Sequence, residues 1–403
     1  MSNQWIGLAS AVQKFKEAVK DEIDKVNEAF HAELNGDAAL RIFGWGPELE
    51  ERNEYRIELS DLLFWHDPTA YFDELERWKG FKITDQHRNI RQILEEKDQT
   101  NVFNNFVSAL RRKRVAPFIG AGLSKPCKYP LWGEAIRKLT RKLEGVSTSE
   151  VRAAKPPLPA IEGIREALDN SNFLLAAQLL YENHKAQIEN FIRNTFDGAS
   201  TRDMKGAILL IPQLTDGCII TTNFDALIEK VFHDENRAIE GYMYGTQTQN
   251  QFAAKLIQGE RCILKLHGNF NSPATYIFSQ VQYDAAYGKN ELDYTKPLAK
   301  VLRQIFISHS LLFLGCSLEQ DRTLELFINV VNSNSFDIPE HFAFLPEPMD
   351  HTLKIDKENL LSTAKIRPIW YKVICNEDGN PDHSELEDML KFAIDCAANR
   401  AKV

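Results

Sequence analysis

Hydrophobic residues repeat at helical spacing near the start of the chain. Over residues 1–35 they recur three and four positions apart, with lysine, aspartate and glutamate on the opposite face, which predicts one long amphipathic helix ending at Asn35-Gly36. Residues 36–100 then mix aromatic with charged residues and predict a small α or α+β module. The apolar stripe of the helix consists of Trp5, Leu8, Val12, Phe15, Val19, Ile23, Val26, Phe30 and Leu34.

A different pattern begins at about residue 101, where short apolar runs alternate with helical stretches. Helices are predicted over 101–114 and near 132–143, a loop rich in serine and proline over 144–160, and further helical structure over about 161–212. The apolar runs that predict strands are VAPFI, GCIITT, RCILKLHG, LLFLGCS, HFAFL and IRPIWYKV.

Strands that alternate with helices need crossover connections, which are typical of a parallel sheet with helices on both faces. The expected fold class is therefore α/β: a doubly wound, Rossmann-like parallel sheet with a helical insertion, joined to a mainly helical N-terminal module. We assign 1–100 to this module and 101–403 to the sheet domain, with the insertion at 145–212.

Composition and charge exclude several classes of partner. Of the 403 residues, 43% are hydrophobic and 26% are charged, which is typical of a soluble globular protein. No segment approaches the ~20 apolar residues that span a bilayer, and the N-terminus becomes charged too early for a secretory signal, so no membrane association is expected. A formal net charge of −9 argues against binding nucleic acid directly over the whole surface. The basic run 111–114 is interpreted as the C-terminus of a helix.

The cysteines are scattered along the chain. None of the six belongs to a C-x-x-C pair, so neither a disulfide framework nor a structural zinc site is expected, and no metal is assigned. This usage fits a reducing cytoplasm, where we expect the protein to reside. The cysteines are Cys127, Cys218, Cys262, Cys316, Cys375 and Cys396.

Four of the predicted strands end in polar residues. Ligands of doubly wound sheets bind at the carboxyl ends of the strands, so these ends predict a site. Asparagine, aspartate and serine here could instead be helix N-caps, an alternative that stays open for Ser124 and Ser317 taken singly. A histidine between an apolar strand and a glycine is harder to explain as packing. The four ends are Gly120-Ala121-Gly122-Leu123-Ser124, Thr221-Thr222-Asn223-Phe224-Asp225, Leu266-His267-Gly268 and Gly315-Cys316-Ser317.

These motifs resemble the NAD-binding domain of the sirtuins. The segments GAGLS…YPLW, TTNFD, LHG and GCS occur in the order and spacing of that family, and Pro130 follows Ser124 by the family's six residues. The resemblance covers about 115–345 and is expected to extend over 101–403 as a domain. It is greatest to the bacterial sirtuin-like NADases of anti-phage defence. Chain size and layout look like the sirtuin-like subunit that is paired with a HerA-type ATPase.

The departures from the family pattern weigh against a protein deacylase. Deacylases of this family carry two zinc-binding C-x-x-C pairs, and this chain has none. The family's Gly-Ile-Pro-Asp-Phe-Arg corresponds to residues 128–133, where the arginine is lost and Trp132 replaces the phenylalanine. Lys125 stands where a dinucleotide fingerprint has its third glycine, a departure that sirtuin-type sites share.

The resemblance implies a role for each strand end. His267 would be the base near the ribose hydroxyls, and Asn223 would orient water or ribose. Asp225 would hold the nicotinamide carboxamide, and Trp132 would cover it or simply belong to the core. The role of Asp321 stays open. The residues expected to bind NAD are Gly120, Ala121, Gly122, Ser124, Trp132, Thr222, Asp225, Gly315 and Ser317.

The expected function is hydrolysis of NAD+ to nicotinamide and ADP-ribose, which would deplete NAD in an infected cell. Such an activity must be gated, by assembly or by a partner of the HerA type. The N-terminal stripe is expected to be buried in a homo-oligomer, the alternative being that it packs on its own chain. Two other functions stay open: a sirtuin-type deacylase or ADP-ribosyltransferase, and an NAD sensor without turnover.

Overall fold

The structure, a computed structural model, describes residues 27–36, 40–45, 52–57, 59–150, 159–248, 251–319, 322–333, 335, 337–375 and 381–403. These residues divide into two compact units, one within Met1–Gln86 with Arg400–Lys402 and one within His87–Asn399 with Val403. The division lies between Gln86 and His87, whereas the sequence suggested a boundary near residue 100. The difference arises because helix α4 (Arg88–Glu96) packs against α5 and α16 of the second unit.

The N-terminal unit is built from helices and a hairpin. Its first described helix ends at Gly36, as predicted, where the backbone turns to a φ of 50°. Two positions of the apolar stripe, Phe30 and Leu34, pack inside this unit around the buried Tyr71. The stripe from Trp5 to Val26 lies outside the described residues. The remaining elements are β1 (Leu40–Trp45), its antiparallel partner β2 (Arg52–Ile57), α2 (Leu59–His66) and α3 (Pro68–Gln86).

The second unit contains a sheet of seven parallel strands in the order β5-β6-β4-β3-β7-β8-β9. The chain fills one half of the sheet from β3 outwards and then returns to fill the other half from β7, so the doubly wound α/β fold is confirmed. The strands are β3 (Val115–Ile119), β4 (Cys218–Thr221), β5 (Gly241–Tyr244), β6 (Cys262–Lys265), β7 (Ser310–Leu314), β8 (His341–Pro346) and β9 (Ile366–Tyr371).

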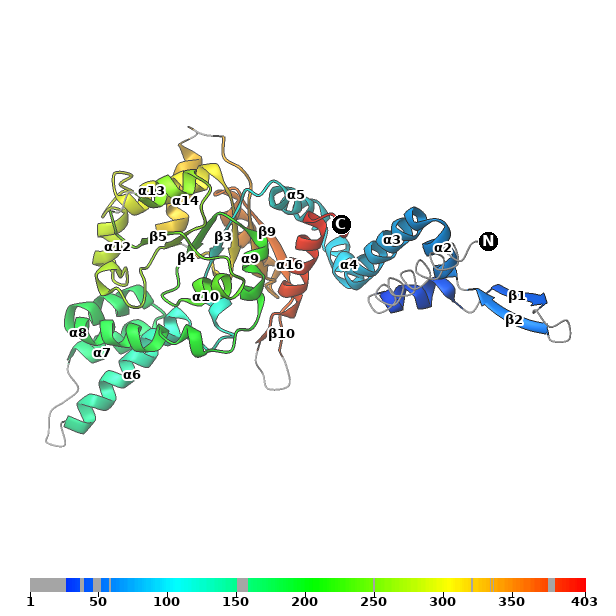
Figure 1. The fold of residues 1–403 in the computed structure, drawn as a ribbon. Helices are drawn as coiled ribbons and strands as arrows, with labels where there is room; N and C mark the ends of the chain where they lie inside the picture. Colours follow the sequence, from blue (N-terminus) through cyan, green and yellow to red (C-terminus); the bar gives the residue numbers. More distant parts are fainter. Residues whose placement is uncertain are drawn as a thin grey trace. The chain divides into compact units, whose positions relative to one another are not determined.

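Helices cover both faces of this sheet (Figure 1). The buried residues of strand β8 point alternately to the two faces of the sheet. The ring centroids of Phe342 and Phe344 each lie 5.5 Å from that of Phe106 on α5, while Ala343 and Leu345 join the core on the opposite face. The α5 face also carries α16. The opposite core includes residues of five helices, namely α11, α12 (Gln280–Tyr287), α13, α14 and α15. These helices are α5 (Thr100–Arg111), α16 (Ser384–Ala397), α11 (Gln251–Ile257), α13 (Pro297–Ser308), α14 (Arg322–Asn332) and α15 (His351–Ser362).

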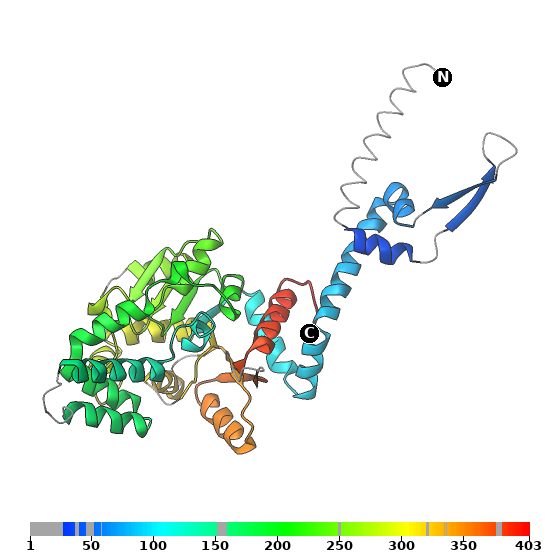
Figure 2. The same ribbon diagram turned by 90° about the horizontal axis from the view of Figure 1, so that it is seen from below.

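The helical insertion lies between β3 and β4, and its helices α6, α7 and α8 lie side by side in both views (Figures 1 and 2). The loop predicted over 144–160 is corrected at both ends, since α6 continues to Glu150 and α7 begins at Pro159. Serine and threonine, on which the loop prediction rested there, each cost a helix less than about 1 kcal/mol. The helices are α6 (Trp132–Glu150), α7 (Pro159–Asp169) and α8 (Phe173–Phe196).

Short elements complete the unit. The sequence did not predict β5, whose four residues alternate between buried and exposed at the sheet's edge. Among the described helices, none is long and apolar enough to cross a membrane. The other elements are α9 (Ile211–Leu214), α10 (Leu227–Asp234), α12 (Gln280–Tyr287), four 3-10 turns (Ala121–Ser124, Ala199–Thr201, Ala207–Leu210 and Pro273–Thr275) and the hairpin of β10 (Ile374–Cys375) with β11 (Pro381–Asp382).

Candidate active site

The sheet reverses its winding between β3 and β7, the place where doubly wound folds bind ligands. There the loop after β3 crosses the loop after β7 backbone to backbone. A Cβ added to Gly120 would lie 2.3 Å from the carbonyl oxygen of Gly315, which is itself left-handed at a φ of +66°. Side chains cannot fit at this crossing. The predicted GAG and GCS motifs therefore meet in space.

The amide groups of this crossing are already in use. Gly120 N donates to the Leu314 carbonyl at 2.9 Å, and Gly122 N donates to the Gly315 carbonyl at 3.0 Å. The sequence places Gly120 and Gly122 among the residues expected to bind NAD, and contact of their amides with the ligand remains a prediction. It would require the loop to exchange its hydrogen bonds with Leu314 and Gly315 for bonds to the ligand.

Four of the predicted side chains form one hydrogen-bond network. Asn223, just after β4, donates from Nδ2 to the Gly120 carbonyl at 3.1 Å and to Ser124 Oγ at 2.9 Å. Ser124 in turn donates to Asp225 Oδ2 at 2.9 Å. Thr222 donates to the remaining amide oxygen of Asn223 at 3.4 Å. The loops after β3 and β4 are thus joined through the residues that the motifs singled out.

Asp225 lies at the buried end of this network. Burial raises the pKa of its carboxyl group, while the nearby Lys265 ammonium and hydrogen bonds from Leu227 N and Ser124 oppose that shift. Leu227 N donates to Asp225 Oδ1 at 3.0 Å, so both carboxyl oxygens accept a hydrogen bond inside the protein. Each oxygen keeps a second lone pair, so the carboxyl group has acceptor capacity beyond these two bonds.

Lys265, which the sequence analysis did not select, connects the loops after β4 and β6 from the buried side. Its side chain is fully buried at the end of β6, where Nζ donates to the Asp225 carbonyl and, at 2.7 Å, to Asn269 Oδ1. It also pairs with Glu229 of α10 at 2.7 Å. An ammonium left without such partners would cost several kcal/mol. The available signal was a lysine inside an otherwise apolar strand, CILKLHG.

His267 follows β6 and is half-buried. Desolvation lowers the pKa of its imidazole to about 4, against a hydrogen bond to the Thr222 backbone that favours the charged ring. The ring is therefore neutral at pH 7. Its Nε2 lies 2.8 Å from the hydroxyl of Tyr283 on α12, a residue that the motifs did not indicate.

Aromatic rings surround this histidine. The ring centroids of Trp132 and Phe224 lie 6.3 and 6.4 Å from that of His267. Trp132 is the first residue of α6, whose start is held by Glu134 accepting a hydrogen bond from Leu131 N at 3.0 Å. It is half-buried, so it contributes to the wall of the site and not only to the core.

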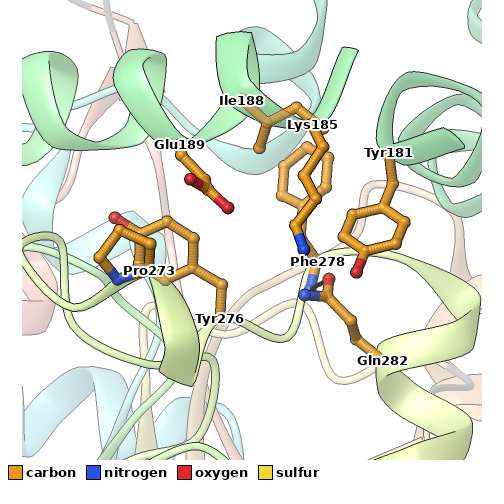
Figure 3. A pocket seen from close by; sticks show the side chains of 8 residues that line it. All are labelled: Tyr181, Lys185, Ile188, Glu189, Pro273, Tyr276, Phe278 and Gln282. Carbon is orange, nitrogen blue, oxygen red and sulfur yellow. Dashed lines mark hydrogen bonds between the residues drawn. The ribbon is translucent and has the colours of Figure 1, made fainter. Parts of the chain in front are cut away.

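The wall continues into a small cleft beside α8. Phe278 packs edge-on against Trp132, with ring centroids 4.6 Å apart, and Tyr276 packs likewise against Phe224 at 5.2 Å. In Figure 3 the Lys185 side chain extends from α8 toward Phe278 and Gln282. The cleft is lined by Tyr181, Lys185, Ile188, Glu189, Pro273, Tyr276, Phe278 and Gln282.

The end of β7 contributes mainly backbone. Cys316 Sγ contacts the Phe118 carbonyl at 3.5 Å, which is a structural contact. Ser317 is exposed, and its carbonyl accepts a hydrogen bond from Lys357 Nζ at 2.6 Å. Asp321 lies outside the described residues. Within the described part of the chain, no three histidine, cysteine, aspartate or glutamate side chains are grouped so that they could hold a metal ion.

Comparison with known proteins agrees with this geometry. Residues 217–369 match the family described as "SIR2-like domain", a range that contains Asn223 and His267. The chain is also 23% identical over 231 residues to the NAD(+) hydrolase ThsA of Bacillus cereus (strain MSX-D12), covering 57% of this chain and 42% of that protein. The same enzyme of Acinetobacter baumannii (strain 532279) is 23% identical over 223 residues, covering 55% and 40%.

A third relative carries the same name. The NAD(+) hydrolase ThsA of Cytobacillus dafuensis is 22% identical over 240 residues, covering 60% of this chain and 42% of that protein. The chain spans about two-fifths of the length of the curated relatives it matches. The resemblance to sirtuin-like NAD+ hydrolases, predicted from the motifs, is confirmed.

Proposed function

We propose that this sirtuin-like chain hydrolyses NAD+ to nicotinamide and ADP-ribose. One observation carries the proposal: Asn223 and His267 follow neighbouring strands whose ends are in register, Thr221 beside Lys265, at the ligand edge of the sheet, where aromatic rings flank His267. The curated relatives that the chain matches are named NAD(+) hydrolases.

The chemistry needs few groups. The bond between ribose and nicotinamide breaks readily because the pyridinium leaves as a neutral base, through a transition state that resembles an oxocarbenium ion. A water must be held at C1′ and must lose a proton as it attacks. His267 is neutral at pH 7 and can accept that proton. The Asn223 amide would orient the water or the ribose hydroxyls.

Binding NAD+ would open the present hydrogen-bond network. The amide of Asn223 now donates to Ser124 and Gly120, and Asp225 accepts from Ser124. We propose that the nicotinamide carboxamide takes one of these places at Asp225, that Trp132 covers the ring, and that the β3–β7 crossing faces the pyrophosphate and adenosine.

We further propose that the activity serves anti-phage defence by depleting NAD and is gated. An enzyme that always hydrolysed NAD+ would harm its own cell, so assembly into a homo-oligomer or a HerA-type ATPase must control it. The support is the motif resemblance. Deleting residues 1–26, which keeps Phe30 and Leu34 in the core of their unit, should reduce the mass of the assembly in light scattering, and an unchanged mass would refute this segment as the oligomer contact.

The test is nicotinamide release by the purified full chain, alone and with a HerA-type ATPase. We expect loss of NAD+ with stoichiometric nicotinamide and ADP-ribose in at least one of the two conditions. Deacetylation of an acetylated peptide would favour the deacylase alternative. Binding of NAD+ in calorimetry without turnover in either condition would favour the sensor.

A further inference from the structure

The contact between Tyr283 and His267 is not part of the motif set. The Tyr283 hydroxyl lies 2.8 Å from His267 Nε2, with the two rings at a T-shaped angle of 73° and centroids 5.6 Å apart. Tyr283 comes from α12, and its ring stacks on the fully buried Tyr287 one turn later, with centroids 6.2 Å apart. The two aromatic side chains therefore hold the hydroxyl against the histidine.

Helix α12 is itself well anchored. Its N-terminus has a capping box in which Ser279 and Gln282 satisfy each other's backbone amides. Gln280 donates to Asp284 at 2.7 Å along the same helix, and the Val281 amide donates to Gln178 of α8 at 3.2 Å. Moving Tyr283 away from His267 would require a new side-chain rotamer or a shift of this anchored helix.

The surroundings of the His267 ring indicate which nitrogen carries its proton. The Thr222 backbone favours the charged imidazole, which is the effect of a carbonyl that faces a ring N–H. With Nε2 facing Tyr283, that nitrogen is Nδ1. The neutral ring then has its only lone pair on Nε2, and the phenol of Tyr283 donates to it.

We propose that Tyr283 and His267 act together as the proton-accepting group of the site, with Tyr283 between the imidazole and the substrate. The proposal rests on the proposed NAD+ hydrolysis. As the water oxygen bonds to C1′ and the C1′–N1 electron pair leaves with nicotinamide, the water proton passes to the Tyr283 oxygen. The phenolic proton passes to Nε2, so the charge ends on His267 as imidazolium and Tyr283 is a phenol again.

Two measurements test this on the full chain. Histidine-selective ¹⁵N NMR reports the protonation of each ring nitrogen, with His267→Gln used to assign the signal among the 10 histidines. We expect an Nδ1–H ring whose Nε2 accepts a hydrogen bond, and an Nε2 signal that moves when Tyr283 is changed to Phe. A proton found on Nε2 in the unmodified protein would overturn the proposal.

The second measurement is nicotinamide release. Tyr283→Phe should lower kcat by about 100-fold with little change in KM, since proton transfer by a positioned group contributes roughly 10²–10⁴. Tyr287→Phe, which removes a hydroxyl from the same aromatic stack, is the matched control and should keep kcat within about threefold. An unchanged or raised kcat in Tyr283→Phe would show that the phenol only caps the base, and would refute the relay.

Failure of the proposed function would be recognised separately. If the unmodified chain releases no nicotinamide, alone or with the ATPase, then NAD+ hydrolysis is refuted and the relay step with it. The Nε2 signal needs no turnover, so it would still decide whether Tyr283 donates to His267.

Discussion

The ligand edge of the sheet has two parts that are built differently. One is the β3–β7 crossing, the backbone half, and the other is formed by the ends of β4 and β6, the side-chain half. The crossing is made of backbone, with Gly120 and Gly315 too close for any Cβ. The β4–β6 side is made of side chains, with Asn223 held by Ser124 of the loop after β3 and His267 by Tyr283 of helix α12. A backbone crossing limits which residues can be present at all, whereas a side-chain network can lose a member and keep its fold. Changes on the two sides should therefore separate stability from chemistry.

The largest expected effect is on the side-chain half. Asn223→Ala and His267→Ala should each remove nearly all nicotinamide release, by about 1,000-fold or ~4 kcal/mol in the barrier, because Asn223 would orient the attacking water or ribose and His267 would take up the released proton. Initial rates with NAD+ measure this, and near-ultraviolet circular dichroism checks the fold. A variant that keeps more than about a tenth of the rate, ~1.4 kcal/mol, would lose its catalytic assignment.

Lys265 is expected to combine the two kinds of effect. Lys265→Met leaves Glu229 without its buried partner and frees the Asp225 carbonyl, which should cost about 3 kcal/mol of unfolding free energy. Urea unfolding of the full chain measures it. The double variant Lys265→Met with Glu229→Gln removes both charges and should recover part of that loss. No recovery would mean that the pair contributes little through charge.

A substitution in the backbone half should lower the stability of the fold. Gly120→Ala places a methyl group 2.3 Å from the Gly315 carbonyl and should cost about 2 kcal/mol or more of unfolding free energy. Gly145→Ala in α6 is the matched control, because its Cβ would meet nothing within 4 Å, and it should gain up to about 1 kcal/mol. Equal effects of the two changes would contradict the tight crossing.

The pH dependence of the rate should report how far the His267 ring is shielded from water. Because burial lowers the pKa of His267 to about 4, the base stays neutral, and active, from pH 8 down to about 5. The rate should fall to half only near pH 4, as the ring gains a proton. A limb near the ordinary histidine value of about 6.5 would show that the ring is solvated.

The smallest expected signal concerns metal. From cysteine spacing alone, the purified protein should contain far less than one zinc per chain in elemental analysis, and NAD turnover should survive a chelator. Stoichiometric zinc would contradict this prediction and favour the deacylase alternative.

Much of this molecule follows from local pattern. Apolar runs of four to six residues predict the buried parallel strands β3, β4 and β6 to β9, because such strands are covered on both faces. Edge strand β5 exposes Tyr242 and has no such run, so it was not predicted. The polar strand ends followed from topology, since parallel strands place their carboxyl ends on one edge.

What the sequence by itself determined were the sheet, its ligand edge and the residues Asn223, Asp225 and His267 that stand there. Only the tertiary structure decided their hydrogen-bond partners, such as Tyr283 from a helix of the following loop and Lys265 reaching Glu229. The physical reason is range. Strand and helix patterns depend on neighbours a few positions apart, whereas a hydrogen bond needs two atoms within about 3 Å from segments that only packing brings together.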